Sequence, residues 1–488
     1  MTTSTLPRAV ATDRFTPGPN AWPGQLTMWR SPPRVPPRSC VHLVDEADDV
    51  PVRSTAELIA YFVGAGKPAS AWRVGTEHEL IGVIKPTGEA PPYDGPHGIG
   101  KLLAAFAAEG GVPVLEDGNA IALTRGDAQI TLEPGGQFEL AARPVTDDHM
   151  FVSDLREYLA SLGDVSQELG LAWLSTGIRP FGTRADIPWM PKLRYDVMRG
   201  YMPTVGTRGL DMMQRTATVQ ANLDFADEAD AAAKLRCLYA NTSILTALWA
   251  CSPIVDEKVT SYQSYRAWIW RDTDNARAGL LPLIFDREDV FTAYTEWALD
   301  VPMYFVYRHR YLTVPANLTF RTFMRDGWNG EHATRADWAM HLSTLFPDGR
   351  LKKFIEVRGC DCGSIEMIEA LAPMMRGLLY DTTARTAASA LTDGMSFEAR
   401  QQLADVVPMQ GFAARAGKHT VGELAKELVA IAADGLSRVA PAAVPLLAPV
   451  HEIATTGRTQ ADRMIELWNQ HAGDRPTLIQ ALAHPGLG

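Results

Sequence analysis

The chain has 488 residues and a formal net charge of −11, from 57 acidic and 46 basic side chains. This acidic balance argues against a nucleic-acid-binding protein, because such proteins need a cationic surface. Five cysteines spread over a chain of this length do not suggest a disulfide framework, so we predict a reducing compartment, which we take to be the cytosol.

The first 50 residues differ in composition from the rest. They contain eight prolines before residue 40, and we predict an extended or disordered leader. They lack the apolar segment of a secretory signal. The best candidate for a membrane span is the uncharged run 237–255, but Asn241 and Pro253 interrupt it, so we predict a buried core helix instead.

The hydrophobic pattern predicts alternating helices and strands after residue 50. A helix begins near Ser54, the expected N-cap, with Leu58 and Phe62 on one face. Further along the chain we predict strands at 73–84, 129–142 and 211–225, helices at 99–109, 148–169 and 229–249, and a helical region after Glu369. The order lacks strict strand–helix–strand alternation, which indicates an α+β fold with an antiparallel sheet. We divide the chain into the leader (1–50), a catalytic core (51–385) and a helical C-terminal region (386–488).

Several predicted strands carry acidic or amide side chains on one face. In a strand, residues i and i+2 point to the same side. The polar faces contain Glu77 with Glu79, Glu133, Gln137 with Glu139, Gln220 with Asn222 and Asp224, and Glu356 with Arg358. Any single strand of this kind could be the solvated face of a sheet. These faces contain almost no lysine, however, and hard divalent cations such as Mg²⁺ bind carboxylate and amide oxygens. We therefore predict a Mg²⁺ site that handles phosphate.

Phosphate chemistry also requires cations, and arginine-rich segments supply them. These segments interleave with Trp, Tyr and Met, which favours a pocket wall over a surface exposed to bulk water. The basic residues are Lys192, Arg194, Arg199, Arg215, Arg266, Arg271, Arg277 and Arg358. Each arginine alone is more often part of a surface salt bridge.

Two motifs were weighed and set aside. The stretch GAGKP (64–68) lacks the first glycine of a P-loop and has Pro68 in place of Ser or Thr. The stretch GCDCG (359–363) has one C-x-C pair and no second pair nearby, so a structural role is favoured over zinc binding.

Taken together, seven stretches resemble the plant and proteobacterial type of glutamate–cysteine ligase, known as glutamate–cysteine ligase family 2. They are GTEHEL, LEPGGQFEL, MPKLRYDVMRGYMP, GLDMMQRTATVQANLDF, RAWIWRDTDNAR, FIEVRG and ATTGRTQADRMIELW. They occur in the family's order between about residues 54 and 470, so the resemblance covers most of the chain and excludes the leader.

The resemblance implies a fold similar to glutamine synthetase, in which a curved antiparallel sheet forms a funnel surrounded by helices. It also implies ATP-dependent joining of the γ-carboxyl of glutamate to the amine of cysteine, with Mg²⁺ bridging the ATP phosphates. The metal ligands implied are Glu77, Glu79, Glu133, Glu139 and Glu356. Gln220, Asn222 and Arg358 are assigned to the nucleotide, and Arg266, Arg194, Lys192, Trp270 and Met213 to substrate. Arg358 and Arg266 are also the expected catalytic residues.

The chain also departs from the family pattern at two places. Ala141 and Ala142 replace Ser-Gly after FEL, and Cys360 and Cys362 replace small residues after EVRG. We place these positions at the border of the amine-acceptor pocket. Two alternatives therefore remain beside cysteine ligation: a γ-glutamyl ligase with another amine acceptor, and a non-catalytic protein that binds glutamate or ATP. We expect small-molecule substrates, no nucleic-acid or membrane partner, and a monomer or homodimer.

Overall fold

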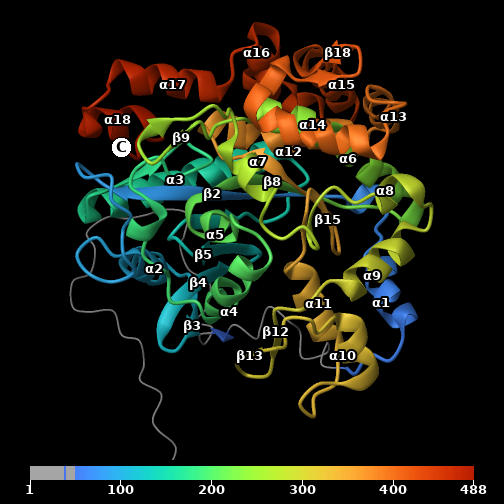
Figure 1. The fold of residues 1–488 in the computed structure, drawn as a ribbon. Helices are drawn as coiled ribbons and strands as arrows, with labels where there is room; N and C mark the ends of the chain where they lie inside the picture. The colour runs from blue at the N-terminus through green and yellow to red at the C-terminus, as the bar shows by residue number, and fades with distance from the viewer. Residues whose placement is uncertain (1–37, 40–49) are drawn as a thin grey trace, which may run out of the picture.

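A computed structural model describes residues 38–39 and 50–488 (Figure 1). The predicted leader, 1–50, therefore lies almost entirely outside the described residues. Within it only a two-residue strand, β1, is placed, and it pairs in parallel with β3. No helix in the described residues is long and apolar enough to cross a membrane. The run 237–255, expected to form a buried helix, lies mostly in helix α6.

The centre of the fold is a ten-stranded sheet in the order β1-β3-β4-β5-β6-β2-β8-β16-β15, with β7 pairing β2. Apart from the β1–β3 pair, its neighbours are antiparallel. Its strands are β1 (Arg38–Ser39), β2 (Val74–Ile84), β3 (Val112–Glu116), β4 (Asn119–Arg125), β5 (Ala128–Leu132), β6 (Phe138–Ala141), β7 (Leu171–Leu174), β8 (Thr218–Leu223), β15 (Gly349–Leu351) and β16 (Ile355–Asp361). The predicted α+β fold with an antiparallel sheet is confirmed.

Eight further short strands form two-stranded pairs outside this sheet. They are β9 (Ile254–Val255) with β10 (Lys258–Val259), β11 (Ala278–Gly279) with β14 (Phe346–Pro347), β12 (Phe305–Tyr307) with β13 (Tyr311–Thr313), and β17 (Arg415–Ala416) with β18 (His419–Thr420).

Helices surround the sheet, and those from α12 to α18 gather on one side of it, orange to red in Figure 1. The helices are α1 (Thr55–Val63), α2 (Ile99–Ala108), α3 (Asp148–Leu169), α4 (Leu193–Tyr201), α5 (Gly209–Arg215), α6 (Glu228–Leu248), α7 (Tyr265–Trp270), α8 (Leu283–Asp286), α9 (Val290–Asp300), α10 (Phe320–Asp326), α11 (Arg335–Ser343), α12 (Ile365–Tyr380), α13 (Thr382–Ala390), α14 (Phe397–Gln410), α15 (Val421–Val439), α16 (Ala448–Thr456), α17 (Gln460–Gln470) and α18 (Arg475–Leu482). The proposed domain boundary at residue 385 falls within α13.

One face of the central strands forms the hydrophobic core. Helix α12 packs against β8 and β2, and α6 packs against β16. On this face Leu80, Val219 and Val357 are buried, because alternate residues of a strand point to the same side. His78, between two of the predicted metal ligands, also points here, and its ring lies edge-on to Tyr158 of α3. The polar residues of the same strands consequently face the opposite side.

Most predicted elements are found within a few residues of their expected bounds. Ser54 caps α1, and its side chain accepts a hydrogen bond from the Glu57 backbone N–H. The strand predicted at 211–225 is wrong in its first half, where α5 runs to Arg215 and β8 begins only at Thr218. The physical reason is that strict alternation of apolar and polar residues holds only from Thr218 onward.

Candidate active site

A cavity of about 480 Å³ lies on the polar face of the sheet. Strands β2, β5, β6, β8, β15 and β16 supply part of its lining, and α4, α5, α7 and α11 supply much of the remainder. Of the predicted site residues, it is lined by Glu77, Glu79, Glu133, Glu139, Lys192, Arg194, Met213, Gln220, Arg266, Trp270 and Arg358. Asn222 and Glu356 are the two predicted residues that do not line it. Its volume is in the range usual for small-molecule sites.

The register of three adjacent strands brings the acidic residues together. Glu79 of β2 lies directly opposite Glu139 of β6. On the other side of β2, Glu77 lies directly opposite Gln220 of β8. Glu133 comes from the turn that connects β5 to β6 and lines the same cavity. Like charges directly opposite each other on antiparallel strands are destabilising, so this arrangement needs compensation.

Each of these four glutamates is anchored through one carboxylate oxygen. Asn222 Nδ2 donates to Glu77 Oε1 at 2.7 Å, and the Thr218 backbone N–H donates to Glu79 Oε2 at 3.0 Å. The Tyr195 hydroxyl donates to Glu133 Oε1 at 2.9 Å, and the Thr131 hydroxyl donates to Glu139 Oε2. Within the described residues, the second oxygen of each carboxylate accepts no hydrogen bond. One oxygen of each therefore fixes the side chain, and the other remains available to a ligand.

The crowding of these carboxylates shifts their proton affinities. Burial, reinforced by the charges of Glu139 and Glu133, raises the pKa of Glu79 well above its usual range. Burial, together with the charges of Glu133 and Glu77, raises the pKa of Glu139 to about 8. Groups whose pKa values are displaced by burial and by specific neighbours in a cavity are candidates for a functional site.

Cationic side chains form the opposite wall of the cavity. Arg350 of β15 lies directly across from Glu356 of β16, and its Nη2 donates to both Glu356 carboxylate oxygens at 2.8 Å. Lys352 Nζ lies 3.4 Å from Glu356 Oε2. Arg358 also pairs with Glu356, and its Nη1 donates to Gln220 Oε1 at 2.9 Å. The acids on β2 and β6 therefore face a cluster of cations across the neutral Gln220.

Glu356 and Asn222 have positions that differ from those expected. Glu356 is fully buried. Burial opposes its ionisation, but the charges of Arg350, Arg358 and Lys352 outweigh it and hold the Glu356 pKa below its usual range. Its carboxylate anchors the cationic wall, in contrast to the four glutamates that line the cavity. Asn222 does not line the cavity, but its side chain donates a hydrogen bond to Glu77 and so holds that carboxylate in place.

A β-bulge in β16 determines which residues after Glu356 reach the site. Val357 pairs with Ala221, whereas Cys360 pairs with Val219, so β16 contains one extra residue between them. Bulges redirect side chains near active sites. Arg358 faces the cavity, and Cys360 and Cys362 are fully buried and line no part of it. Our placement of the two cysteines at the acceptor pocket is therefore wrong, whereas Ala141 does line the cavity.

Arg266 is positioned by a buried carboxylate that the sequence analysis did not identify. Asp361 Oδ2 accepts hydrogen bonds from the Cys251 backbone N–H at 2.9 Å and from the Ser252 hydroxyl at 2.6 Å. Its Oδ1 accepts from the Ser264 hydroxyl at 2.9 Å and lies 3.8 Å from Arg266 Nη1.

The two serines link Asp361 to the backbone of α7. Ser264 is the N-cap of this helix, and its hydroxyl accepts from the Ala267 N–H at 3.1 Å. The Ser252 hydroxyl accepts from the Arg266 N–H at 3.0 Å. Asp361 thus orients both the side chain and the helix that carry Arg266. Asp361 is the central residue of the stretch GCDCG. The sequence analysis considered only the two cysteines of that stretch and not the aspartate between them.

The remaining predicted residues divide into those in the cavity and those elsewhere. Lys192 Nζ donates to the Leu132 carbonyl at 3.2 Å, and burial lowers its pKa against the charge of Glu133. The Arg194 guanidinium lies over the Phe305 ring. Arg277 is fully buried and paired with Asp274, outside this cavity.

Arg350 and Lys352 are the main cavity residues that the sequence analysis missed. Both are in the stretch GRLKKFIEVR, directly before the family motif FIEVRG. Strands β15 and β16 form a hairpin whose turn lies between Leu351 and Ile355, and this hairpin places Arg350 opposite Glu356. The turn contains no Asn-Gly or Asp-Gly pair, the usual sequence signal of a hairpin, so the sequence did not indicate the pairing.

The cavity therefore combines a cluster of carboxylates with a cluster of cations. In comparison with known families, the model of glutamate-cysteine ligase family 2 matches residues 73–481, so the chain belongs to that family. A chloroplastic glutamate–cysteine ligase of Nicotiana tabacum is 40% identical over 417 residues, 85% of this chain and 79% of that protein. Ligase A of Oryza sativa subsp. japonica, also chloroplastic, is 40% identical over 416 residues, 84% of each chain.

Among solved structures, the fold is similar to a glutamate–cysteine ligase from Francisella tularensis in complex with AMP. The TM-score is 0.53 at 14% sequence identity, covering 84% of this chain and 87% of that one. At this identity the likeness concerns the fold alone.

The comparison contradicts the prediction of a cytosolic location, because the similar plant proteins are chloroplastic. That prediction rested on cysteine usage. The four cysteines in the described residues are indeed unbonded and buried. Free thiols distinguish a reducing compartment from an oxidising one but do not distinguish one reducing compartment from another.

The raised pKa of Glu139 predicts a pH-dependent stability of the metal-free protein. Its pKa is about 8 in the folded state, against an ordinary value of 4.5. Between these values the folded state binds more protons than the unfolded chain, so the free energy of unfolding should fall as pH rises from about 5 to 8. One proton contributes at most about 1.4 kcal/mol per pH unit. The measurement is chemical unfolding in EDTA at pH 5, 6.5 and 8.

Glu139→Gln is the matched variant, because it removes the titrating group and preserves the shape. Its stability should fall less steeply than that of the wild type over the same window. Equal slopes for the two proteins would show that Glu139 is ionised throughout the range.

Proposed function

We propose that the protein is an ATP-dependent ligase that joins the γ-carboxyl of glutamate to the amine of cysteine. One observation carries the proposal: Glu77, Glu79, Glu133 and Glu139 converge on one cavity whose opposite wall is cationic. Phosphoryl transfer needs both charges, since metal ions bind the phosphate oxygens and arginines stabilise the transferring group. Family membership supports this reading.

The four cavity glutamates fit Mg²⁺ as a cofactor. Their carboxylates are hard oxygen donors, and each has one oxygen free of hydrogen bonds from the described residues. In residues 50–488, no three Asp, Glu, His or Cys side chains form a ready metal cage. Mg²⁺ does not require one, because it usually takes one or two carboxylates and completes its shell with water and substrate phosphates. When bound, it neutralises charge on the phosphates.

The chain's own residues then have separate roles. Arg358, held by Glu356 and Gln220, presents its guanidinium to the γ-phosphoryl group as it moves from ATP to the γ-carboxylate of glutamate. Arg350 and Lys352 supply further positive charge beside it. The resulting acyl phosphate is a good electrophile, so the acceptor amine displaces phosphate. Most of the rate acceleration arises from positioning and electrostatic stabilisation.

Arg266 binds the α-carboxylate of glutamate in this scheme. Its side chain is 3% exposed and lines the cavity. Its Nη2 donates to the Arg358 carbonyl at 3.0 Å, so the substrate arginine and the phosphate arginine are directly coupled. A planar guanidinium binds a carboxylate through two parallel hydrogen bonds.

The test of the proposal is product formation by the full-length protein. With ATP, Mg²⁺ and glutamate, we expect ADP release that depends on cysteine, and a product of the mass of γ-glutamylcysteine. A panel of other amino acids and small amines tests the acceptor. Binding of Mg·ATP without ADP release with any amine would refute ligase activity. Faster turnover with another amine would correct the acceptor and leave the ligase chemistry in place.

Arg266→Lys should weaken glutamate binding more than it slows turnover. The α-carboxylate keeps its charge through the reaction, so its contact is similar in the ground and transition states. Lys keeps the charge but cannot reproduce the fork. We expect the KM for glutamate to rise about tenfold, or about 1.4 kcal/mol, with the KM for ATP within about threefold of wild type. A parallel rise in both constants would assign Arg266 to the phosphate site.

Asp361→Asn should raise the KM for glutamate in the same way as Arg266→Lys, although Asp361 itself does not contact the substrate. The amide keeps the size of the carboxylate but loses the charge near Arg266 and one acceptor for the serine hydroxyls. We expect a rise of about tenfold in the KM for glutamate, with a smaller change in kcat. Asp326→Asn, at an exposed pair with Arg325, is the control and should change neither constant by more than about twofold. A fall in kcat alone would exclude the positioning role.

A further inference from the structure

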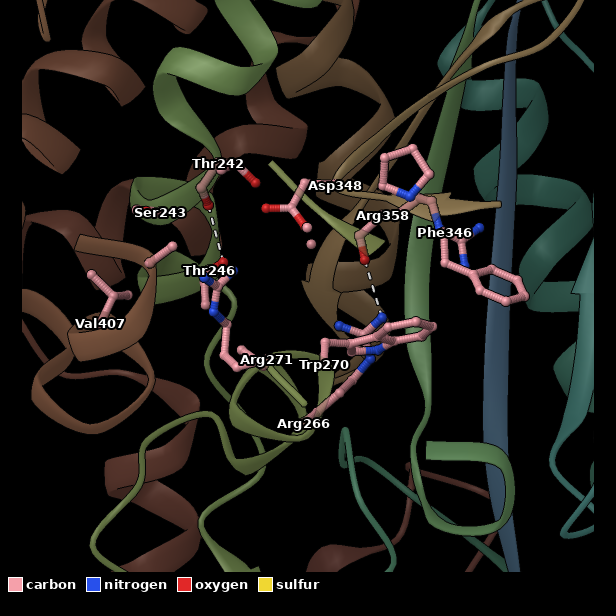
Figure 2. Close-up of a pocket in the computed structure, with 15 residues that line it drawn as sticks. Thr242, Ser243, Thr246, Arg266, Trp270, Arg271, Phe346, Asp348, Arg358 and Val407 are labelled. Atoms are coloured by element: carbon pink, nitrogen blue, oxygen red, sulfur yellow. Dashed lines mark hydrogen bonds between the residues drawn. The ribbon is translucent and has the colours of Figure 1, made fainter. Parts of the chain in front are cut away.

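A second, smaller pocket adjoins the active-site cavity behind Arg266 (Figure 2). Its volume is about 50 Å³, space for a few heavy atoms, since one water needs about 10–15 Å³ by the same kind of measure. Arg266, Trp270, Phe346 and Arg358 line both spaces, so these residues form the partition between them. The far wall comes from α6 and α14.

Asp348 is the acidic residue of this pocket. It lies between β14 and β15, and its backbone is fixed by a hydrogen bond from its N–H to the Gly279 carbonyl at 3.0 Å. In Figure 2 its carboxylate points toward Thr242 of α6, and Arg266 and Arg271 lie below it. Burial raises the Asp348 pKa, and the charges of Arg271, Arg266 and Arg358 oppose that rise.

The charges in the pocket are matched except at Asp348. Arg271 pairs with Asp405 at 2.7 Å, Arg358 pairs with Glu356, and Arg266 lies 3.8 Å from Asp361. In the described part of the chain, Asp348 forms no ion pair. A carboxylate that is largely enclosed and has no cation within ion-pair distance is costly, and a bound cationic group would offset that cost.

Two hydrogen-bond donors on the partition also lack acceptors. Arg266 Nε and Trp270 Nε1 are buried and make no hydrogen bond within the described residues. Both side chains line the pocket. Buried donors are almost always satisfied in native proteins, so these two point to an acceptor supplied by a ligand. The pocket thus combines an unmatched anion with unmatched donors on an arginine and a tryptophan.

We propose that this pocket binds the head group of an α-amino acid, with the α-ammonium on Asp348 and the α-carboxylate on Arg266 and Trp270. The inference rests on the proposed function and names the residue that recognises the amine of one of its amino-acid substrates. A simple anion would leave Asp348 unpaired and be repelled by it. A metal ion needs several oxygen ligands, and among the described residues that line the pocket Asp348 is the only carboxylate. An α-amino acid carries both charges on five head-group atoms, which suits the size of the pocket.

In the proposed function Arg266 binds the α-carboxylate of glutamate, so the ammonium on Asp348 is that of glutamate, and calorimetry tests this assignment. In the presence of Mg²⁺ and a non-hydrolysable ATP analogue, wild-type protein should bind glutamate at least tenfold more tightly than glutarate, which lacks the ammonium. If Asp348 holds the ammonium of glutamate, Asp348→Asn should bind the two within about threefold of each other. A preference that persists in Asp348→Asn, with a rise of about tenfold in the KM for the acceptor instead, would overturn the assignment to glutamate.

Asp148→Asn is the matched control, because Asp148 is also buried and pairs with Arg376 outside both cavities. It should change neither substrate constant by more than about twofold. If Asp348→Asn does not fold, Asp348→Glu serves instead: it keeps the charge but moves the carboxylate, and it should give a smaller shift in the same constant.

The proposal is overturned if neither amino-acid constant changes by more than twofold in a folded variant. It is also overturned if the KM for ATP rises in parallel, since that would indicate general damage to the site. Failure of the proposed function would look different: no amine would support ADP release in the wild type, while the calorimetric comparison of glutamate with glutarate would still report on Asp348.

Discussion

The direct opposition of Glu79 and Glu139 on neighbouring strands is the constraint on which the rest of the site depends. Two carboxylates at this register repel each other, and Glu77 and Glu133 add to the repulsion. The chain tolerates the arrangement because β2 lies in the middle of a ten-stranded sheet whose other face is packed by α3 and α12. A large buried core can hold a locally unfavourable charge cluster that a small domain could not.

The cations are kept apart from these acids rather than paired with them. A direct Arg–Glu pair at Glu79 or Glu139 would relieve the repulsion, but it would also occupy the oxygens that a ligand needs. The chain instead uses a separate carboxylate, Glu356, to hold Arg350, Lys352 and Arg358 on β15 and β16. The neutral Gln220 lies between the two groups. The result is a cavity that carries acids on β2 and β6 and cations on β15 and β16, which is the charge arrangement that the proposed phosphoryl transfer requires.

A second buried carboxylate, Asp361, has the same supporting role for Arg266. It gathers a backbone N–H, two serine hydroxyls and the guanidinium around one side chain. Both Glu356 and Asp361 lie on β16, on either side of the bulge at which Arg358 enters the cavity. This strand therefore orients the two cavity arginines, Arg266 and Arg358, through carboxylates that do not themselves line the cavity.

The sequence by itself determined which carboxylates share a face of each strand, because the two-residue period of a strand is a local property. It also located α1, α2, α3 and α6, since caps such as Ser54 and helical periodicity are local too. Only the tertiary structure decided that β6, β2 and β8 are neighbours, that Arg350 lies opposite Glu356, and that the bulge sends Cys360 into the core. It also brought Asp348 and Asp361 beside Arg266. These contacts join segments far apart in the chain, and their geometry depends on pairing and packing of the whole sheet, which no local pattern encodes.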